Sequence, residues 1–266
     1  MKLPFALTLP LLAISAPALA QAVPKTERNL PATDTSLSFS TGVDYSEGTY
    51  GSTVKTKILV VPASVRVKTG DFRFGATLPY LRIDGANVVG GGAGGPIVIN
   101  PTSPRTVRSG LGDLSLSATY AVPEDRYGLG VEFTGRVKLP TASTSRGLGT
   151  GKTDVSALVD VSKSFGNVTP FVDVGYKWTG DPSYINLKNT WFGSAGLSVA
   201  AGKSVIIASY DYQGATSPLS FDSHEVFGAF STPVSDRLNF TLYGSAGLSR
   251  GAPDFGVGGI VTIKAF

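Results

Sequence analysis

The chain has 266 residues, of which 16% are charged, and its formal net charge is +4. Soluble domains usually carry about 25% charged residues, so the composition argues against an ordinary soluble domain. The absence of cysteine excludes disulfides, zinc–thiolate sites and cysteine nucleophiles, and so small a positive excess gives no reason to expect a nucleic-acid partner.

Residues 1–20 have the features of a cleaved signal peptide. Lys2 gives a positive start, residues 3–14 are mostly apolar, and Ala18, Leu19 and Ala20 form a small-x-small cleavage pattern. The apolar part is shorter than the ~18–20 residues that a membrane-spanning helix needs. Residues 21–34 are then expected to form a short periplasmic N-terminal tail, and residues 35–266 a single domain.

From residue 35 onward, segments of about ten residues alternate between apolar and polar side chains, which is typical of barrel strands. In residues 129–139, Val131, Phe133 and Val137 alternate with Glu132, Thr134, Arg136 and Lys138. Twelve such segments start near residues 36, 54, 72, 110, 128, 153, 169, 189, 205, 224, 238 and 255. The second is the weakest, because residues 58–61 are apolar on both faces.

The connections between these segments alternate in length. Short connections fall at residues 68–71, 123–127, 165–168, 201–204 and 232–237, and longer ones lie mostly between them, at 46–53, 85–109, 141–152, 180–188 and 213–223. Short periplasmic turns and long external loops are typical of outer-membrane barrels. This topology puts two aromatic groups at opposite strand ends, as interfacial belts require: Tyr45, Tyr80, Trp178, Trp191, Tyr210 and Tyr212 outside, and Phe72, Tyr120, Phe230, Phe240 and Phe266 on the periplasmic side.

These patterns predict an all-β protein, a transmembrane up-and-down antiparallel β-barrel of about 12 strands in the bacterial outer membrane. Closure follows from hydrogen bonding, since lipid offers no partner to the edge of an open sheet. The expected surroundings are outer-membrane lipid outside and a small-molecule solute inside.

The alternation places charged side chains of both signs on the inner face, as candidate lumen-lining residues. They are Arg73, Glu132, Arg136, Lys138, Asp154, Asp160, Asp173, Lys177 and Asp211. These charges could pair across the wall and fill a sealed structural barrel, or together form a polar passage without strong charge selectivity. About twelve strands is intermediate between filled eight-stranded barrels and open channels of sixteen or more.

The longest connection contains a Gly- and Pro-rich stretch with apolar residues, from Gly85 to Pro104. Apolar residues in an exposed loop could fold into the lumen or cover the external mouth. Disorder is the alternative.

Two patterns suggest chemistry only weakly, and neither catalytic nor metal-binding nor cofactor-binding residues are expected. Residues 147–153 resemble a phosphate-binding loop, but Arg146 stands where the motif needs glycine and a strand follows instead of a helix. His224 is the only histidine and stands beside Asp222, Ser223 and Glu225. Strand neighbours point to opposite faces, so a hydrolase using His224 is kept only as an alternative function.

The chain ends in Phe266, which resembles the C-terminal aromatic that barrel-assembly machinery reads in outer-membrane proteins. Lys264 stands where that pattern is usually apolar or aromatic.

Several short stretches resemble a family of outer-membrane β-barrels named as transporters of the meta-pathway of phenol degradation. They are residues 78–80 (Leu-Pro-Tyr), 110–114 (Gly-Leu-Gly-Asp-Leu), 138–141 (Lys-Leu-Pro-Thr), 147–151 (Gly-Leu-Gly-Thr-Gly) followed by Asp154, and 175–176 (Gly-Tyr) near Gly180. The resemblance implies a barrel for uptake of small, hydrophobic or aromatic compounds and brings no catalytic residue. The sequence thus predicts a passive outer-membrane channel rather than an enzyme, with no cofactor.

Overall fold

The computed structural model describes residues 35–85, 87–89, 97–100, 102 and 104–266. The predicted signal peptide (1–20) and tail (21–34) lie outside the described residues. The strands are β1 (Thr35–Gly48), β2 (Thr56–Thr69), β3 (Phe72–Gly85), β4 (Asn87–Val89), β5 (Ile97–Asn100), β6 (Thr106–Leu111), β7 (Leu114–Val122), β8 (Gly130–Leu139), β9 (Asp154–Ser162), β10 (Val168–Trp178), β11 (Thr190–Ala201), β12 (Ser204–Gln213), β13 (Ser223–Pro233), β14 (Leu238–Gly247) and β15 (Phe255–Lys264), with one short helix, α3 (Glu124–Tyr127).

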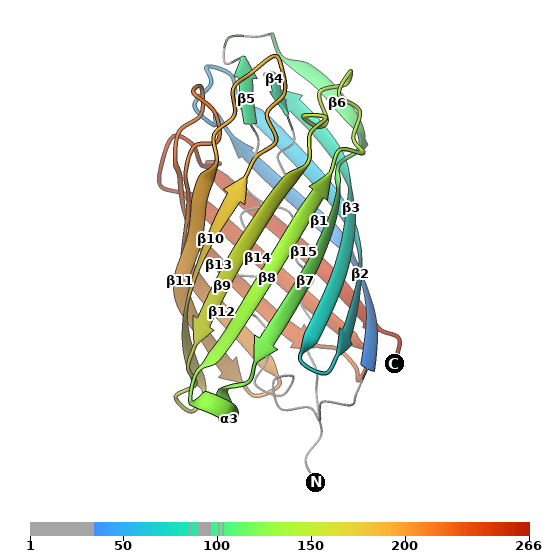
Figure 1. The fold of residues 1–266 in the computed structure, drawn as a ribbon, viewed down its shortest axis with the longest axis vertical. Helices are drawn as coiled ribbons and strands as arrows, with labels where there is room; N and C mark the ends of the chain where they lie inside the picture. The colour runs from blue at the N-terminus through green and yellow to red at the C-terminus, as the bar shows by residue number, and fades with distance from the viewer. Residues whose placement is uncertain (1–34, 86, 90–96, 101, 103) are drawn as a thin grey trace.

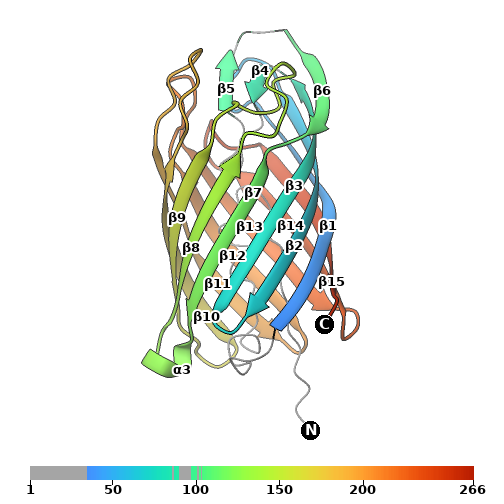
Figure 2. The ribbon, with the colours of Figure 1, turned by 45° about the vertical axis from the view of Figure 1, so that its right-hand side comes forward.

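The main sheet closes into an antiparallel barrel (Figures 1 and 2). From β7 to β15 each strand pairs with the next in the sequence, β15 pairs with β1, β1 with β2, and β2 with β3, whereas β4 and β5 form a small sheet of their own. Strands β6 and β7 follow one another along β3 and count as one position in the wall. The result is a wall of twelve strand positions, which confirms the predicted fold class.

The break between β6 and β7 falls at Gly112 and Asp113. Residues 80–85 of β3, toward the external end, pair with β6, and residues 72–77 pair with β7. At the break, the Gly112 N–H donates to the Pro79 carbonyl at 2.8 Å. A Cβ at Gly112 would lie 2.9 Å from Pro79 Cγ, so the wall needs glycine at this crossing. The next residue, Asp113, is thereby turned toward the loop of residues 140–153, where the Ala142 N–H donates to its Oδ1 at 2.9 Å.

Side chains alternate between an apolar outer face and an inner face that is mostly polar. On β10, Val172 and Val174 are 47% and 52% exposed, whereas Asp173 between them is 1% exposed. A β-barrel in a bilayer needs apolar side chains on the face toward lipid and has polar side chains on the face toward its lumen. In the described part of the chain, no helix is both long and apolar enough to span a bilayer.

The two ends of the barrel differ. The start of β1 and the C-terminus lie at the end that carries α3, and the long connections, including the small β4–β5 sheet, lie at the other (Figures 1 and 2). By the usual asymmetry of such barrels, the first end is periplasmic and the second external. Large aromatic side chains are exposed at both ends: Trp178, Trp191 and Tyr210 at external strand ends, and Phe72 and Phe230 at periplasmic ones.

Candidate functional site: the barrel lumen

All nine charged residues predicted to point inward occupy strand positions that alternate with the exposed outer ones. Six are buried, namely Lys138, Asp154, Asp160, Asp173, Lys177 and Asp211. The other three, Arg73, Glu132 and Arg136, are half-buried. The sequence analysis missed further inner charges, among them Asp44, Arg66, Lys68, Glu225 and Lys264, although each stands in a strand between outward-facing residues.

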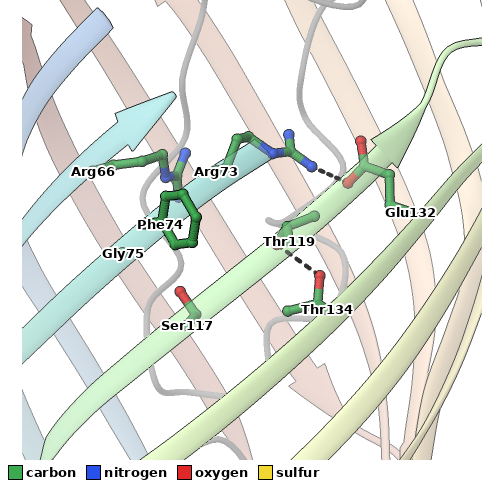
Figure 3. Close-up of a pocket in the computed structure, with 8 residues that line it drawn as sticks. All are labelled: Arg66, Arg73, Phe74, Gly75, Ser117, Thr119, Glu132 and Thr134. Atoms are coloured by element: carbon green, nitrogen blue, oxygen red, sulfur yellow. Dashed lines mark hydrogen bonds and ion pairs between the residues drawn. The ribbon is translucent and has the colours of Figure 1, made fainter. Parts of the chain in front are cut away.

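In the periplasmic half of the lumen, Arg73 of β3 donates to Glu132 of β8. The two side chains lie over Thr119 and Thr134, whose hydroxyls are hydrogen-bonded at 2.8 Å (Figure 3). Beside them is a cavity of about 30 Å³, which has room for about two water molecules. This ion pair lies along one side of the wall, because β7 alone separates β3 from β8.

At the external end, Lys138 joins three parts of the chain. Its Nζ lies 3.2 Å from Asp113 Oδ2 and 3.1 Å from Asp154 Oδ2, and all three side chains are less than 10% exposed. The carboxylates also accept backbone N–H bonds, from Ala142 to Asp113 and from Gly180 to Asp154. Lys138 therefore ties β8 to the break in the wall and to two external loops.

The pairing register arranges most inner acidic side chains in one row across six adjacent strands. The row is Glu132 (β8), Asp160 (β9), Asp173 (β10), Ser194 (β11), Asp211 (β12) and Glu225 (β13), each paired with the next. Because barrel strands are tilted, the row climbs from the periplasmic end of β8 to the external end of β13. This acidic row crosses the whole height of the barrel.

Basic side chains form a second row that is separate from the acidic one. It runs Lys177 (β10), Ser156 (β9), Arg136 (β8), Ser117 (β7), Gly75 (β3), Arg66 (β2), Ser38 (β1) and Lys264 (β15). On β8 and β10 the two rows stand four residues apart, about 13 Å along a strand. The sequence predicts both signs in the lumen; the register adds that several charges of each sign stand in separate rows, whereas Arg73 and Lys138 lie beside the carboxylates of Glu132 and Asp154.

The inner face also carries an apolar cluster on the strands of the acidic row. Phe171, Val205, Ile207, Phe227 and Ala229 are buried against one another, with Tyr243 packed beside them. The Tyr243 and Phe227 ring centroids are 6.0 Å apart. In the sequence, Phe171 interrupts the alternation of its strand, and the cluster explains why an apolar residue stands on the inner face there.

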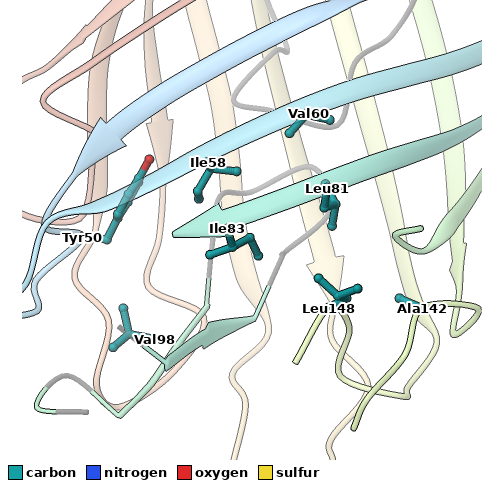
Figure 4. Packing of buried hydrophobic residues seen from close by; sticks show 8 residues of the cluster. All are labelled: Tyr50, Ile58, Val60, Leu81, Ile83, Val98, Ala142 and Leu148. Carbon is teal, nitrogen blue, oxygen red and sulfur yellow. The ribbon is translucent and has the colours of Figure 1, made fainter. Parts of the chain in front are cut away.

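A second apolar cluster covers part of the external mouth (Figure 4). It joins inner residues of β2 and β3 to external loops: Tyr50, Ile58, Val60, Leu81, Ile83, Val98, Ala142 and Leu148. Val98 belongs to the Gly85–Pro104 stretch, and its carbonyl also accepts a hydrogen bond from Ser217 Oγ at 3.4 Å. The described part of this stretch thus belongs to this partial cover of the mouth, and residues 58–61 are apolar on both faces because Ile58 and Val60 belong to it as well.

His224 lies on the outer face of β13, away from the lumen. Its Nδ1 is hydrogen-bonded to the Tyr210 hydroxyl at 2.5 Å, and its ring contacts Tyr212. Ser223 and Glu225, the neighbours that a hydrolase would use, bond to each other at 3.1 Å on the inner face. The strand therefore separates the histidine from these two residues.

Residues 147–153 form an external loop that leads into β9, not a helix. Gly147 and Gly151 have φ values of 65° and 72°, which suit the tight turns of the loop. The same loop supplies Leu148 to the cover and Thr150 Oγ1, 3.3 Å from Lys138 Nζ. Its glycines thus serve the packing of the loop. Among the residues that the structure describes, no group of three or more His, Asp or Glu side chains could hold a metal ion.

Phe266 is 65% exposed, and its carbonyl accepts a hydrogen bond from the Leu37 N–H at 3.3 Å. The last residue thus lies beside the first strand, at the closure of the barrel. Lys264 belongs to the inner face, at the periplasmic end of the basic row.

Solved structures share the fold at low sequence identity. The COG4313 outer membrane channel from Pseudomonas putida F1 superposes with a TM-score of 0.66 at 14% identity, over 88% of this chain and 96% of that one. Two looser matches are the CymD monoaromatic hydrocarbon channel (TM-score 0.42, 13% identity, 90% and 89% covered) and the translocator domain of the autotransporter NalP from Neisseria meningitidis (0.48, 13%, 90% and 90%). A search of curated proteins found no match.

The closed barrel, its lipid-facing apolar exterior and its aromatic strand ends are those of an outer-membrane protein. The profile of the family described as "Putative MetA-pathway of phenol degradation" matches residues 34–264. This match covers most of the chain and confirms the resemblance found in the short stretches above. The chain belongs to this family of outer-membrane β-barrels.

Proposed function

We propose that the protein is a passive outer-membrane channel for small solutes, including hydrophobic or aromatic ones. The observation that carries the proposal is a closed wall with an apolar outer face and an inner face bearing charged rows of both signs. A barrel that served only as a structural element would need no row of charged side chains across its height. The shared fold with the COG4313 outer membrane channel from Pseudomonas putida F1 gives further support.

The acidic and basic rows and the apolar cover have distinct roles in this proposal. The rows give a permeating solute polar partners along the wall, and the buried external cluster around Val98 holds loops over part of the entrance. No energy-coupling element is required, so flux follows the concentration gradient. The exposed apolar belt contacts outer-membrane lipid.

Biogenesis belongs to the same proposal. Residues 1–20 would direct export and be removed, residues 21–34 would remain as a periplasmic tail, and Phe266 would serve as the assembly signal for the barrel-assembly machinery. The role of Phe266 fits its position beside β1, where the barrel closes.

Planar-bilayer recording tests the channel directly. The purified barrel should produce discrete current steps in KCl, and His224→Ala should leave the steps unchanged because His224 lies on the outer face. The complete absence of steps from folded protein would favour a sealed barrel. Loss of a hydrolytic activity in His224→Ala, with no conductance in either protein, would favour the enzyme alternative.

A further inference from the structure

The external end of the acidic row brings like charges together. Asp211 and Glu225 are direct partners in the register of β12 and β13, and both are buried on the inner face. Directly opposite residues have Cβ atoms about 4.5–5.5 Å apart, and like charges in that position are destabilising.

A third carboxylate, Asp44, stands on the inner face of β1, which is separated from β13 by β14 and β15 in the wall. It is 2% exposed and interacts electrostatically with Glu225. The Tyr243 hydroxyl donates to Asp44 Oδ2 at 2.9 Å, whereas Oδ1 has no hydrogen-bond partner among the described residues.

The Asp211 carboxylate also has a hydrogen-bond donor at only one of its two oxygens, among the described residues. It is 5% exposed; Ser209 Oγ donates to its Oδ1 at 2.9 Å, and Oδ2 has no partner in the described part of the chain. Within those same residues, neither Asp44 nor Asp211 forms an ion pair with a lysine or arginine. A buried carboxylate oxygen without a donor costs free energy, so both oxygens are poised to accept from a ligand.

The apolar inner cluster lies directly on the periplasmic side of these carboxylates. Phe227 stands two residues from Glu225 on the same face of β13, and Phe171 two residues from Asp173 on β10. A Cβ at Gly196 would lie 2.7 Å from Phe171 Cζ, so glycine lets this ring lie along the wall. Acidic oxygens and aromatic rings thus face the same part of the lumen.

We propose that this part of the lumen binds solutes that carry a protonated amine on an apolar body. An ammonium has three donors and no acceptor, which matches the free oxygens of Asp44 and Asp211, and aromatic faces attract cations. A divalent metal fits less well, since the described side chains form no metal-binding group. The inference rests on the proposed channel function and specifies a solute class for it.

Block of the KCl current by benzylammonium tests the inference, with benzyl alcohol as the uncharged analogue. Benzylammonium should reduce the current at lower concentration than benzyl alcohol. Neutralising the pair with Asp211→Asn and Glu225→Gln should raise the half-blocking concentration of benzylammonium at least about tenfold, as expected for loss of a charge-assisted contact. Asp125→Asn, in the exposed helix α3, should leave block unchanged.

Two further variants separate the charged and apolar parts of the site. Asp44→Asn removes one carboxylate without touching β12 or β13 and should also weaken block, which keeps the test valid if the double variant fails to fold. Phe227→Leu should weaken block by benzylammonium more than block by methylammonium. If the wild-type channel conducts KCl but benzylammonium blocks no better than benzyl alcohol, the inference is overturned and the channel proposal stands. If folded protein carries no current, both are overturned.

Discussion

Replacing Lys138 by methionine should lower the free energy of unfolding by about 3–5 kcal/mol, the usual cost of breaking a buried ion pair from one side. The reason is that the substitution leaves Asp113 and Asp154 buried without their shared cation. Urea titration of the barrel in lipid bilayers measures the change, with the fluorescence of the two tryptophans, Trp178 and Trp191, as the probe.

Two variants make this first prediction specific. Lys152→Met removes an exposed lysine of the external loop that follows β8 and should change stability by less than about 1 kcal/mol. Adding Asp113→Asn and Asp154→Asn to Lys138→Met should recover most of the loss, because each asparagine can still accept the backbone N–H bond that the carboxylate accepts. A Lys138→Met barrel as stable as Lys152→Met would show that the triad does not hold the external end together.

Replacing Leu148 by alanine should loosen the external cover and raise the single-channel conductance. Leu148 is 1% exposed and packs in the cluster that joins the loop of residues 140–153 to β2 and β3 (Figure 4). Removing a buried leucine side chain costs about 2–5 kcal/mol of packing free energy. Because this packing holds the loop over the mouth, the expected result is a larger and noisier current in planar bilayers.

The matched control for Leu148 is Leu219→Ala, which truncates a 42% exposed leucine of another external loop. This control should leave both the conductance and the unfolding midpoint at wild-type values. If Leu148→Ala conducted like Leu219→Ala while its unfolding midpoint fell, the cover would stabilise the barrel without restricting flux.

The strands could be predicted from the sequence because a bilayer restricts which side chains and which backbone pairings a spanning segment can have. Each spanning segment must pair on both sides and turn an apolar face outward, so alternation alone located all twelve wall positions. The same pattern misled only locally. Phe171 and Ile58 break the alternation, and the structure shows that both belong to apolar clusters inside the barrel.

The sorting of the charges could not be predicted, because it depends on which residues face each other across strands. A row such as Asp173, Ser194 and Asp211 exists only in one pairing register, and that register is set by turns and barrel shear rather than by any one segment. Glu225 was noticed in the sequence only as a neighbour of His224, although its strand position already placed the two on opposite faces.

The ion pair between Lys138 and Asp113 could not be predicted from the sequence either. Asp113 lies between β6 and β7, where the period-2 pattern stops, so alternation says nothing about its direction. The break at Gly112 and the contacts with the Ala142 N–H and Lys138 hold this carboxylate toward the loop. Tertiary contacts, not local pattern, decide such positions.

Cysteine accessibility in proteoliposomes tests most directly whether the wall separates lipid from a hydrated lumen. The chain has no cysteine, so single substitutions give an unambiguous signal. Adjacent residues on opposite faces serve as pairs: Leu116 and Phe133, 41% and 49% exposed on the outside, against Ser117 and Thr134 on the inside. A charged, water-soluble thiol reagent should modify Ser117→Cys and Thr134→Cys and spare Leu116→Cys and Phe133→Cys. Modification of the outer pair, or protection of the inner pair, would contradict a water-accessible lumen enclosed by a lipid-facing wall.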